Sequence, residues 1–295
     1  MENKKAGFIA VVGRPNAGKS SILNLLVGER VAMVSKKAQA TRKRMQIIVM
    51  HENSQLIFID TPGIHKKEKL LNKFMLEEAL KAIGDCDLIL FIAPASDKTD
   101  EYEKFLELNE RKKTKHIIVL NKIDQIPQAK LLQKLGEYQK FQEHFEAIIP
   151  FSVNKNVGKK ELIELVSKYI PEHPWLYDDE ILTTEHIRSI YKEFIRESIF
   201  ENMSDEIPYE SDVIIDKIEE NVHLDKILAT VIVEKDIQKK MIIGKNGEGI
   251  KRIGIHARKN IEKFSAKKIH LELFVSVKSG WSKNKEELEN FGYIF

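Results

Sequence analysis

Gly13-Arg14-Pro15-Asn16-Ala17-Gly18-Lys19-Ser20 separates an apolar run from the start of a helical pattern. The run, residues 7–12, is typical of a short buried strand, and residues 21–26 begin the helical pattern. A strand, a glycine-bounded loop and a helix are the context in which such a loop binds phosphate. Backbone N–H groups of the loop and the positive end of the helix dipole then face one anion. The stretch therefore predicts a phosphate-binding loop in an α/β fold.

Two side chains at the end of this loop suit a nucleoside triphosphate bound with magnesium. Lys19 places a point charge near the terminal phosphates, and the Ser20 hydroxyl is a suitable Mg²⁺ ligand. Ser21 follows directly and belongs to the predicted nucleotide site. The alternative is a glycine-rich turn with a lysine beside it by chance, and the flanking strand and helix argue against it.

A second motif predicts which base is bound. Asn121-Lys122-Ile123-Asp124 follows the apolar run 117–120, so it lies at the carboxyl end of a second buried strand, where open α/β sheets bind ligands. An aspartate there accepts hydrogen bonds from the N1–H and exocyclic amine of guanine, whereas adenine would present an acceptor to it. Four such residues alone are often only a helix start. Downstream of a phosphate-binding loop, they predict a guanine pocket.

The segment between these motifs predicts the parts of a nucleotide-dependent switch. The apolar run 56–59 leads into Asp60-Thr61-Pro62-Gly63, where Asp60 can hold Mg²⁺ through water. Gly63 has no side chain, so its N–H can approach the γ-phosphate closely. Thr41 lies in the interval where a second switch threonine belongs, and a purely structural threonine is the alternative.

Ile64 follows this motif at the position where many GTPases carry a glutamine that orients the attacking water. Isoleucine can neither donate nor accept a hydrogen bond with its side chain. The water must then be oriented by backbone groups, another segment or a partner. The sequence therefore predicts slow intrinsic hydrolysis, as suits a timed switch.

Composition is consistent with a soluble globular protein of two domains. The chain has 295 residues, of which 42% are hydrophobic and 32% charged, with a net charge of +3. Cys86 is the only cysteine, which excludes an intrachain disulfide and suits a reducing cytoplasm. No apolar stretch approaches the roughly 20 residues of a membrane helix. The polar start of the chain does not resemble a signal peptide.

The pattern of apolar runs predicts two architectures in succession. Strand-like and helix-like segments alternate up to about Tyr169, which predicts a mainly parallel sheet covered by helices on both faces. Residues 170–175 contain two prolines and are the best linker candidate. We expect a first domain at 1–172 and a smaller α+β domain at 173–295, whose segments follow the order helix, two strands, two helices and a strand.

The second domain contains a GxxG turn between two helical segments. Its sequence, Ile243-Gly244-Lys245-Asn246-Gly247, precedes a basic helix beside a three-stranded sheet, and the whole resembles a KH domain of the bacterial type. Such a turn clamps the backbone of about four nucleotides of single-stranded nucleic acid. An ordinary helix–helix turn with solvated lysines is the alternative. The predicted RNA-binding residues are those of the turn and four cations beyond it: Ile243, Gly244, Lys245, Asn246, Gly247, Lys251, Arg252, Arg258 and Lys259.

Taken together, these motifs resemble the translation-factor-type GTPases, and the Era family of ribosome-assembly GTPases in particular. The resemblance rests on the motifs above, on residues 35–42 and 60–65, and on Phe151-Ser152-Val153, which matches the segment behind the guanine. Relatives commonly have threonine where Ala40 stands and alanine where Val153 stands. The Val153 N–H can still reach the guanine oxygen, so we place Ser152 and Val153 in the nucleotide site.

The resemblance implies a P-loop GTPase domain followed by a type II KH domain. It implies GTP or GDP and Mg²⁺ as ligands, with Ser20, Thr41 and, through water, Asp60 holding the metal. Lys19 and Thr41 are then the catalytic residues, joined by Asn16, because the equivalent asparagine of related GTPases helps hold K⁺ near the phosphates. The alternative for Asn16 is that it only braces the loop.

The resemblance also implies the partners: the 3′ end of 16S ribosomal RNA and the 30S subunit, bound by a cytoplasmic monomer. Peripheral association with the inner face of the membrane is left open. The runner-up function is a membrane-associated signalling GTPase whose GxxG domain binds a protein. The lysines and arginines of the GxxG helix favour RNA over a protein partner. A third reading is a GTP-binding RNA chaperone that hydrolyses very little.

Overall fold

A computed structural model describes the backbone of residues 4–32, 41–62, 70–110, 112–204 and 206–293. Two compact units divide these residues, and, apart from residues 70–74, which are grouped with the second unit, the first reaches to Thr184 and the second begins at Glu185. Gly63 and Ile64, predicted to contact the nucleotide, and Ala40 lie outside the described residues. Among the described residues, no helix is both long and apolar enough to cross a membrane.

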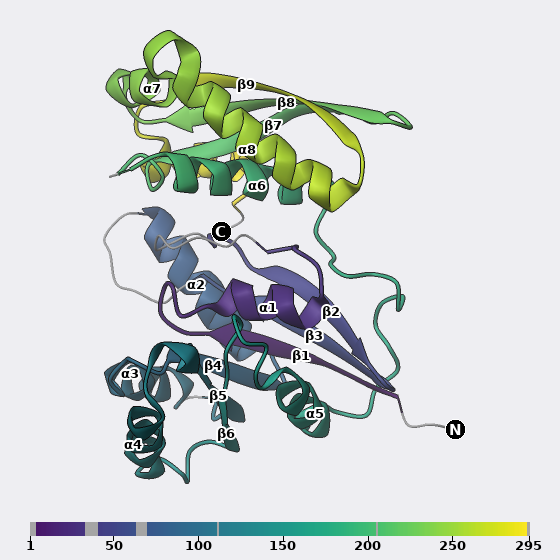
Figure 1. Cartoon of the computed structure of the whole chain (residues 1–295), viewed down its shortest axis with the longest axis vertical. Coiled ribbons are helices and arrows are strands. Elements are labelled where there is room, and N and C mark those ends of the chain that lie inside the picture. Colours follow the sequence, from purple (N-terminus) through teal and green to yellow (C-terminus); the bar gives the residue numbers. More distant parts are fainter. Residues whose placement is uncertain (1–3, 33–40, 63–69, 111, 205, 294–295) are drawn as a thin grey trace. The chain divides into compact units, whose positions relative to one another are not determined.

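The first unit is built on a six-stranded sheet in the order β2-β3-β1-β4-β5-β6 (Figure 1). Every neighbouring pair is parallel except β2 and β3, which form an antiparallel hairpin. The mainly parallel sheet predicted from the alternating pattern is thereby confirmed. Its strands are β1 (Lys5–Val12), β2 (Met45–His51), β3 (Ser54–Asp60), β4 (Leu88–Pro94), β5 (His116–Asn121) and β6 (Ala147–Pro150).

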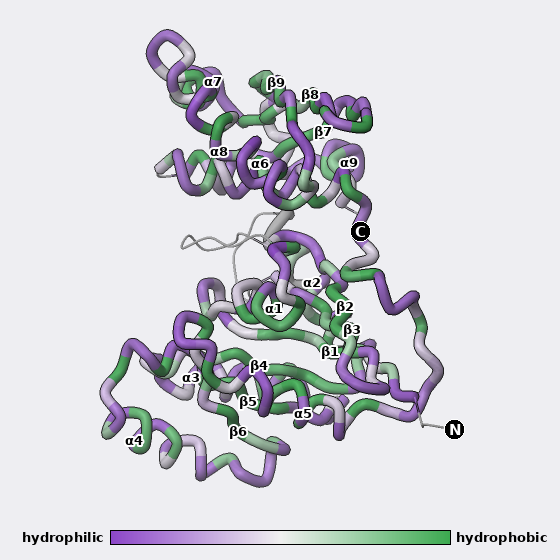
Figure 2. The backbone as a smooth tube through the Cα atoms, turned by 45° about the vertical axis from the view of Figure 1, so that its right-hand side comes forward, coloured by the Kyte–Doolittle hydropathy of each residue, from purple (hydrophilic) through white to green (hydrophobic). Residues whose placement is uncertain are grey.

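Helices cover both faces of this sheet. The helices α1 and α5 pack in one apolar core, and α2, α3 and α4 lie against the other face, where Tyr102 and Phe105 of α3 are buried. Figure 2 shows the strands as mostly hydrophobic and the connecting loops as mostly hydrophilic, as expected of a sheet buried on both sides. The helices are α1 (Lys19–Val27), α2 (Leu70–Gly84), α3 (Asp100–Asn109), α4 (Gln128–Gln139) and α5 (Lys159–Tyr169).

Residues 173–184 pack along the β2–β3 hairpin. The buried Gln55 amide accepts from the backbone N–H groups of Leu176 (2.8 Å) and Tyr177 (3.0 Å). The Thr183 hydroxyl donates to the Gln46 carbonyl at 2.6 Å. The first compact unit therefore extends twelve residues beyond the predicted boundary at 172/173. The reason is that Gln46 and Gln55 of the hairpin bind residues of the segment 173–184.

The second unit has the predicted order of helix, two strands, two helices and a strand. Its sheet has the order β7-β8-β9, antiparallel between β7 and β8 and parallel between β8 and β9. A short 3₁₀ turn at Trp281–Lys283 and the helix α9 (Lys285–Asn290) follow, with Trp281 fully buried. The preceding elements are α6 (Ile187–Asn202), β7 (Ser211–Glu219), β8 (Leu224–Val233), α7 (Asp236–Ile243), α8 (Glu248–Ser265) and β9 (Lys268–Val277).

Candidate functional site

The predicted phosphate-binding loop connects the end of β1 to the start of α1. Gly13 has φ 155°, and a Cβ there would lie 2.4 Å from the Ile92 carbonyl oxygen of β4. Gly18 has φ 99° and immediately precedes α1, whose first turn has no side-chain cap. The backbone N–H groups at this helix end are therefore available to an anion.

Lys19 lies under this loop and is 6% exposed. Its ammonium donates to the carbonyl oxygens of Gly13 (3.1 Å) and Arg14 (3.2 Å). Burial is the main cause that lowers the Lys19 pKa to about 8, with Asp60 opposing this shift and Arg14 adding to it. Terminal phosphates beside Lys19 would favour its charged form.

Three side-chain oxygens from different segments meet beside Lys19. The Ser20 hydroxyl donates to Asp60 Oδ2 at 2.7 Å and lies 3.2 Å from Thr41 Oγ1, which donates to the same carboxylate oxygen at 3.3 Å. Burial raises the Asp60 pKa, and Asp60 Oδ1 is buried without a hydrogen-bond partner. A cluster of oxygen ligands with one unsatisfied carboxylate oxygen fits Mg²⁺, which also keeps waters and phosphate oxygens as ligands. The predicted metal residues are thus brought together.

Side chains distant in sequence hold the phosphate-binding loop. The Asn121 amide at the end of β5 donates to the Ala17 carbonyl at 2.9 Å, and a Cβ on Gly18 would lie 2.3 Å from that same amide nitrogen. The Lys122 ammonium donates to the Asn16 carbonyl at 2.7 Å. The guanine motif and the phosphate-binding loop therefore form one site, with Asn121 and Lys122 fixing the loop.

Arg14 and Thr61 have structural contacts that their motifs did not predict. The Arg14 guanidinium forms a two-point ion pair with Asp97, which follows β4. The buried Thr61 hydroxyl donates to the Val11 carbonyl at 2.6 Å, and so joins the end of β3 to β1. Both residues were placed in the nucleotide site from sequence. In the structure, their side chains connect the segments that surround this site.

Asp124 is exposed at the edge of the sheet, where an incoming base can reach it. Its Oδ1 accepts from the buried Ser152 hydroxyl at 2.6 Å, and its Oδ2 accepts from the Asn154 amide at 3.0 Å. The hydrogen bond from Ser152, followed by that from Asn154, lowers the Asp124 pKa. The carboxylate is thus fixed in its ionised, accepting form. Asn154 was missed because nothing in its sequence context distinguishes it from other loop residues.

The GxxG turn in the second unit has a left-handed backbone. The φ angles of Gly244, Asn246 and Gly247 are 72°, 53° and 78°. Gly249 allows α7 and α8 to approach closely, since a Cβ there would lie 2.4 Å from the Ile242 carbonyl oxygen. Successive N–H groups in such a turn form a concave anion site, and α8 begins there without a side-chain cap.

A groove runs between α8 and β9 beside this turn. It is lined by Ile250, Lys251, Gly254 and Arg258 of α8 and by Leu271 and Leu273 of β9. Apolar walls suit bases, and the cations suit phosphates. These apolar residues were not predicted to bind RNA, although the spacing of 250, 254 and 258 indicates that they share one helical face.

The predicted RNA-binding cations do not all line this groove. Lys251 and Arg258 do, and Lys245 is exposed in the turn itself. Arg252 and Lys259 are also exposed, but they lie with α6 on the opposite flank of α8.

Comparisons with known proteins agree with both sites. Residues 8–122 match the family described as 50S ribosome-binding GTPase, and residues 195–282 match the KH domain family. The GTPase Era of Campylobacter concisus is 50% identical over 98% of this chain and 100% of its own length. The GTPase Era of Helicobacter pylori is 48% identical over 98% of this chain and 97% of its own length.

Two solved structures resemble the whole chain, each with a TM-score of 0.94 and 32% identity over 99% of this chain and 100% of theirs. One is Era in complex with MgGDPNP and nucleotides 1506–1542 of 16S ribosomal RNA. The other is a variant of Aquifex aeolicus Era bound to GDP and AlF4⁻.

Proposed function

The chain belongs to the Era family of GTPases, and from this we propose that it is a GTP-hydrolysing switch that binds the 3′ region of 16S ribosomal RNA and assists 30S subunit maturation. One observation carries the nucleotide half of this proposal. The Asn121 amide binds the Ala17 carbonyl, so the guanine motif and the phosphate-binding loop act on the same ligand. The GxxG turn and its groove support the RNA half.

We assign the phosphates to the loop 13–20, whose N–H groups act together with Lys19. Asp124 accepts from the guanine N1–H and amine, and the Val153 N–H donates to the guanine oxygen. Mg²⁺, held by Ser20, Thr41 and, through water, Asp60, would neutralise charge on the phosphate oxygens. Ser21 and Pro62 belong to the same site, as do Gly63 and Ile64 outside the described residues. The ordered donors around the phosphates stabilise the charge that develops during transfer.

We further propose that Asn16 helps to place K⁺ beside the phosphates, where a cation substitutes for the missing glutamine. Asn16 has φ 62°, a left-handed conformation that asparagine adopts readily. Hydrolysis should then be faster in K⁺ than in Na⁺ at equal ionic strength, and Asn16→Ala should abolish the difference while largely preserving nucleotide binding. Equal rates in both salts would return Asn16 to a bracing role.

For the RNA, we propose that the GxxG turn and the α8–β9 groove hold about four nucleotides of a single-stranded segment. The bound Era relative contains nucleotides 1506–1542 of 16S ribosomal RNA, and we assign the same region to this chain. We place the protein in the cytoplasm as a monomer acting on the 30S subunit. A peripheral location on the membrane is the runner-up.

Two measurements on the purified full chain test this function. Multiple-turnover release of phosphate from GTP distinguishes a slow GTPase from a binding protein. Equilibrium binding of the 1506–1542 transcript distinguishes an RNA module from a protein-binding one. Turnover without RNA binding would leave a GTPase whose second unit binds something else. RNA binding without turnover would favour the chaperone.

A further inference from the structure

The helix α8 presents two different flanks to solvent. Residues 250, 254 and 258 share the flank that faces β9. Four other side chains recur at the spacing i, i+4, i+7 and i+11, which places them on one face of an α-helix. They are Arg252, His256, Lys259 and Lys263. Between these flanks, Ile253, Ala257 and Ile261 are buried in the core of the unit.

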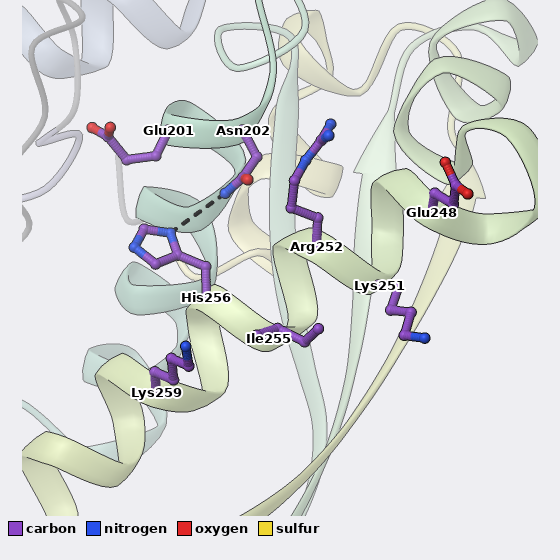
Figure 3. Close-up of a pocket in the computed structure, with 8 residues that line it drawn as sticks. All are labelled: Glu201, Asn202, Glu248, Lys251, Arg252, Ile255, His256 and Lys259. Atoms are coloured by element: carbon purple, nitrogen blue, oxygen red, sulfur yellow. Dashed lines mark hydrogen bonds between the residues drawn. The ribbon is translucent and has the colours of Figure 1, made fainter.

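A groove lies along this second flank, where α8 packs beside the end of α6. Figure 3 shows Asn202 of α6 facing His256, with Arg252 and Lys259 on the same side of α8, and Lys251 pointing away from α6. We call Asn202, Arg252, His256, Lys259 and Lys263 the α6–α8 face. Two carboxylates, those of Glu201 and Glu248, also line the groove, the second from the first turn of α8.

The groove fixes the orientation of the half-buried imidazole in its centre. Asn202 Nδ2 donates to the Ser198 carbonyl at 2.8 Å and lies 3.4 Å from His256 Nδ1. The contact with Ser198 establishes the amide nitrogen as the donor, so His256 Nδ1 accepts. A neutral His256 therefore carries its proton on Nε2, which can donate to a ligand in the groove.

The cations of this face lack the ion pairs that two lysines on other helices form. Lys104 on α3 pairs with Glu101 at 2.7 Å, and Lys160 on α5 pairs with Glu164 at 3.7 Å. Within the described part of the chain, Arg252, Lys259 and Lys263 form no ion pair with a carboxylate. Like charges spaced by three or four residues weaken a helix. An external anion would remove this repulsion, so the pattern indicates a binding surface.

We propose that the α6–α8 face binds the sugar–phosphate backbone of RNA that flanks the segment held by the GxxG turn. This inference rests on the proposed function. A GxxG turn accounts for about four nucleotides, far fewer than the 1506–1542 segment bound to the Era relative. Cations, an imidazole donor and the exposed Ile255 suit phosphate and ribose, and the open shape of the groove does not enclose a base.

The test compares two RNAs on the full chain with GTP and Mg²⁺ present. One is the 1506–1542 transcript, and the other is the tightest-binding piece of about six nucleotides from that transcript, enough to fill a GxxG site. Arg252→Ala/Lys259→Ala removes two cations of the face, and Lys226→Ala/Lys283→Ala removes two exposed cations elsewhere in the second unit. Alanine is a strong helix former, so the first variant should fold at least as stably as the parent.

The first variant should bind the long transcript about tenfold or more weakly, since it loses charge-assisted hydrogen bonds to phosphate. Its salt slope should fall by about one to two, as expected for phosphate contacts. Its affinity for the short piece should stay within about twofold of the parent, and the control variant should match the parent for both RNAs. An equal loss for both RNAs, or no loss for either, overturns the separate surface. Failure of the parent to bind either RNA overturns the proposed function instead.

Discussion

The phosphate-binding loop and the GxxG turn end in the same way but have different surroundings. Each ends in a glycine of positive φ, Gly18 at 99° and Gly247 at 78°, directly before a helix without a side-chain cap. Around Gly18, the space that a Cβ would need is taken by the Asn121 amide at 2.3 Å. Around Gly247, apart from its two chain neighbours, no heavy atom of the described residues lies within 4 Å of a Cβ position.

This difference separates two ways of binding phosphate. The phosphate-binding loop forms hydrogen bonds with the side chains of Asn121, Lys122 and Asp97, which are all distant in sequence. Its N–H groups are therefore fixed before the ligand arrives. The GxxG turn is formed by local backbone and stays open on its outer side, which leaves room for a polymer to pass. A fixed loop suits one small ligand with strict selectivity, and an open turn suits a chain whose other contacts lie elsewhere.

The largest expected effect is a loss of selectivity for guanine at the nucleotide site. Asp124→Asn replaces an acceptor with a donor, so it loses a charge-assisted pair with guanine and matches the carbonyl of xanthine. We expect GTP affinity to fall on the order of 10³-fold, with binding shifted towards XTP. Equilibrium titration with both nucleotides measures this shift. Unchanged GTP affinity would remove the guanine pocket from the account.

The next effect concerns the open turn. Gly247→Asp places a carboxylate where phosphates approach the backbone, so RNA affinity should fall on the order of 10²-fold. GTP affinity should stay at the parent value, because the nucleotide site belongs to the other unit. The positive φ of Gly247 is strained for aspartate, so folding is checked by thermal unfolding. A folded variant that binds RNA as tightly as the parent would favour a protein ligand for this unit.

The third prediction compares two variants, to measure how much the phosphate-binding loop depends on its contact with the distant Asn121. Asn121→Ala leaves the Ala17 carbonyl without its donor, which should cost about 1–3 kcal/mol of stability and lower GTP affinity on the order of tenfold. Asn246→Ala in the open turn should cost about 1 kcal/mol, from its left-handed backbone alone, and leave GTP affinity unchanged. Denaturant unfolding and nucleotide titration separate the two. Equal effects would remove the distinction between a supported and a local turn.

The smallest effect is a pH dependence of nucleotide binding. The free-site Lys19 pKa is about 8, and bound phosphates raise it, so binding takes up a proton where the free lysine is neutral. Affinity should hold below pH 8 and fall by at most about tenfold per unit above it. Burial raises the pKa of Asp60, which has the opposite effect at acid pH. There Mg²⁺ displaces the proton of Asp60, so binding releases a proton. Calorimetry in buffers of different ionisation enthalpy near pH 8.5 should detect uptake, and its absence would contradict a buried Lys19.

The parts of the fold that sequence predicted are those determined by short segments. Apolar runs gave the strands of both sheets, and the glycine motifs gave the loop before α1 and the turn before α8. The antiparallel β2–β3 hairpin also follows from the apolar runs 47–50 and 56–59, with the polar residues 52–55 between them. Each of these features depends on residues close together in the chain, where periodicity and turn chemistry decide the structure.

The missed features depend on contacts between distant segments. Gln55 binds residues 176 and 177, more than a hundred positions away, so no local pattern could have placed residues 173–184 against the first unit. Arg14 and Asp97, which also pair, are 83 positions apart. The division of the α8 cations into two flanks requires knowing which face is buried, which only the packing against α6 and β9 shows.

The central claim is that one chain joins a guanine-specific phosphate site to an RNA site for the 3′ region of 16S ribosomal RNA. Crosslinking the full chain to RNA in cells and sequencing the bound fragments tests this claim most directly. We expect a footprint within the 3′ region of 16S ribosomal RNA, which Gly247→Asp removes and Lys226→Ala/Lys283→Ala retains. A footprint elsewhere, or one that survives Gly247→Asp in a folded protein, would contradict the account.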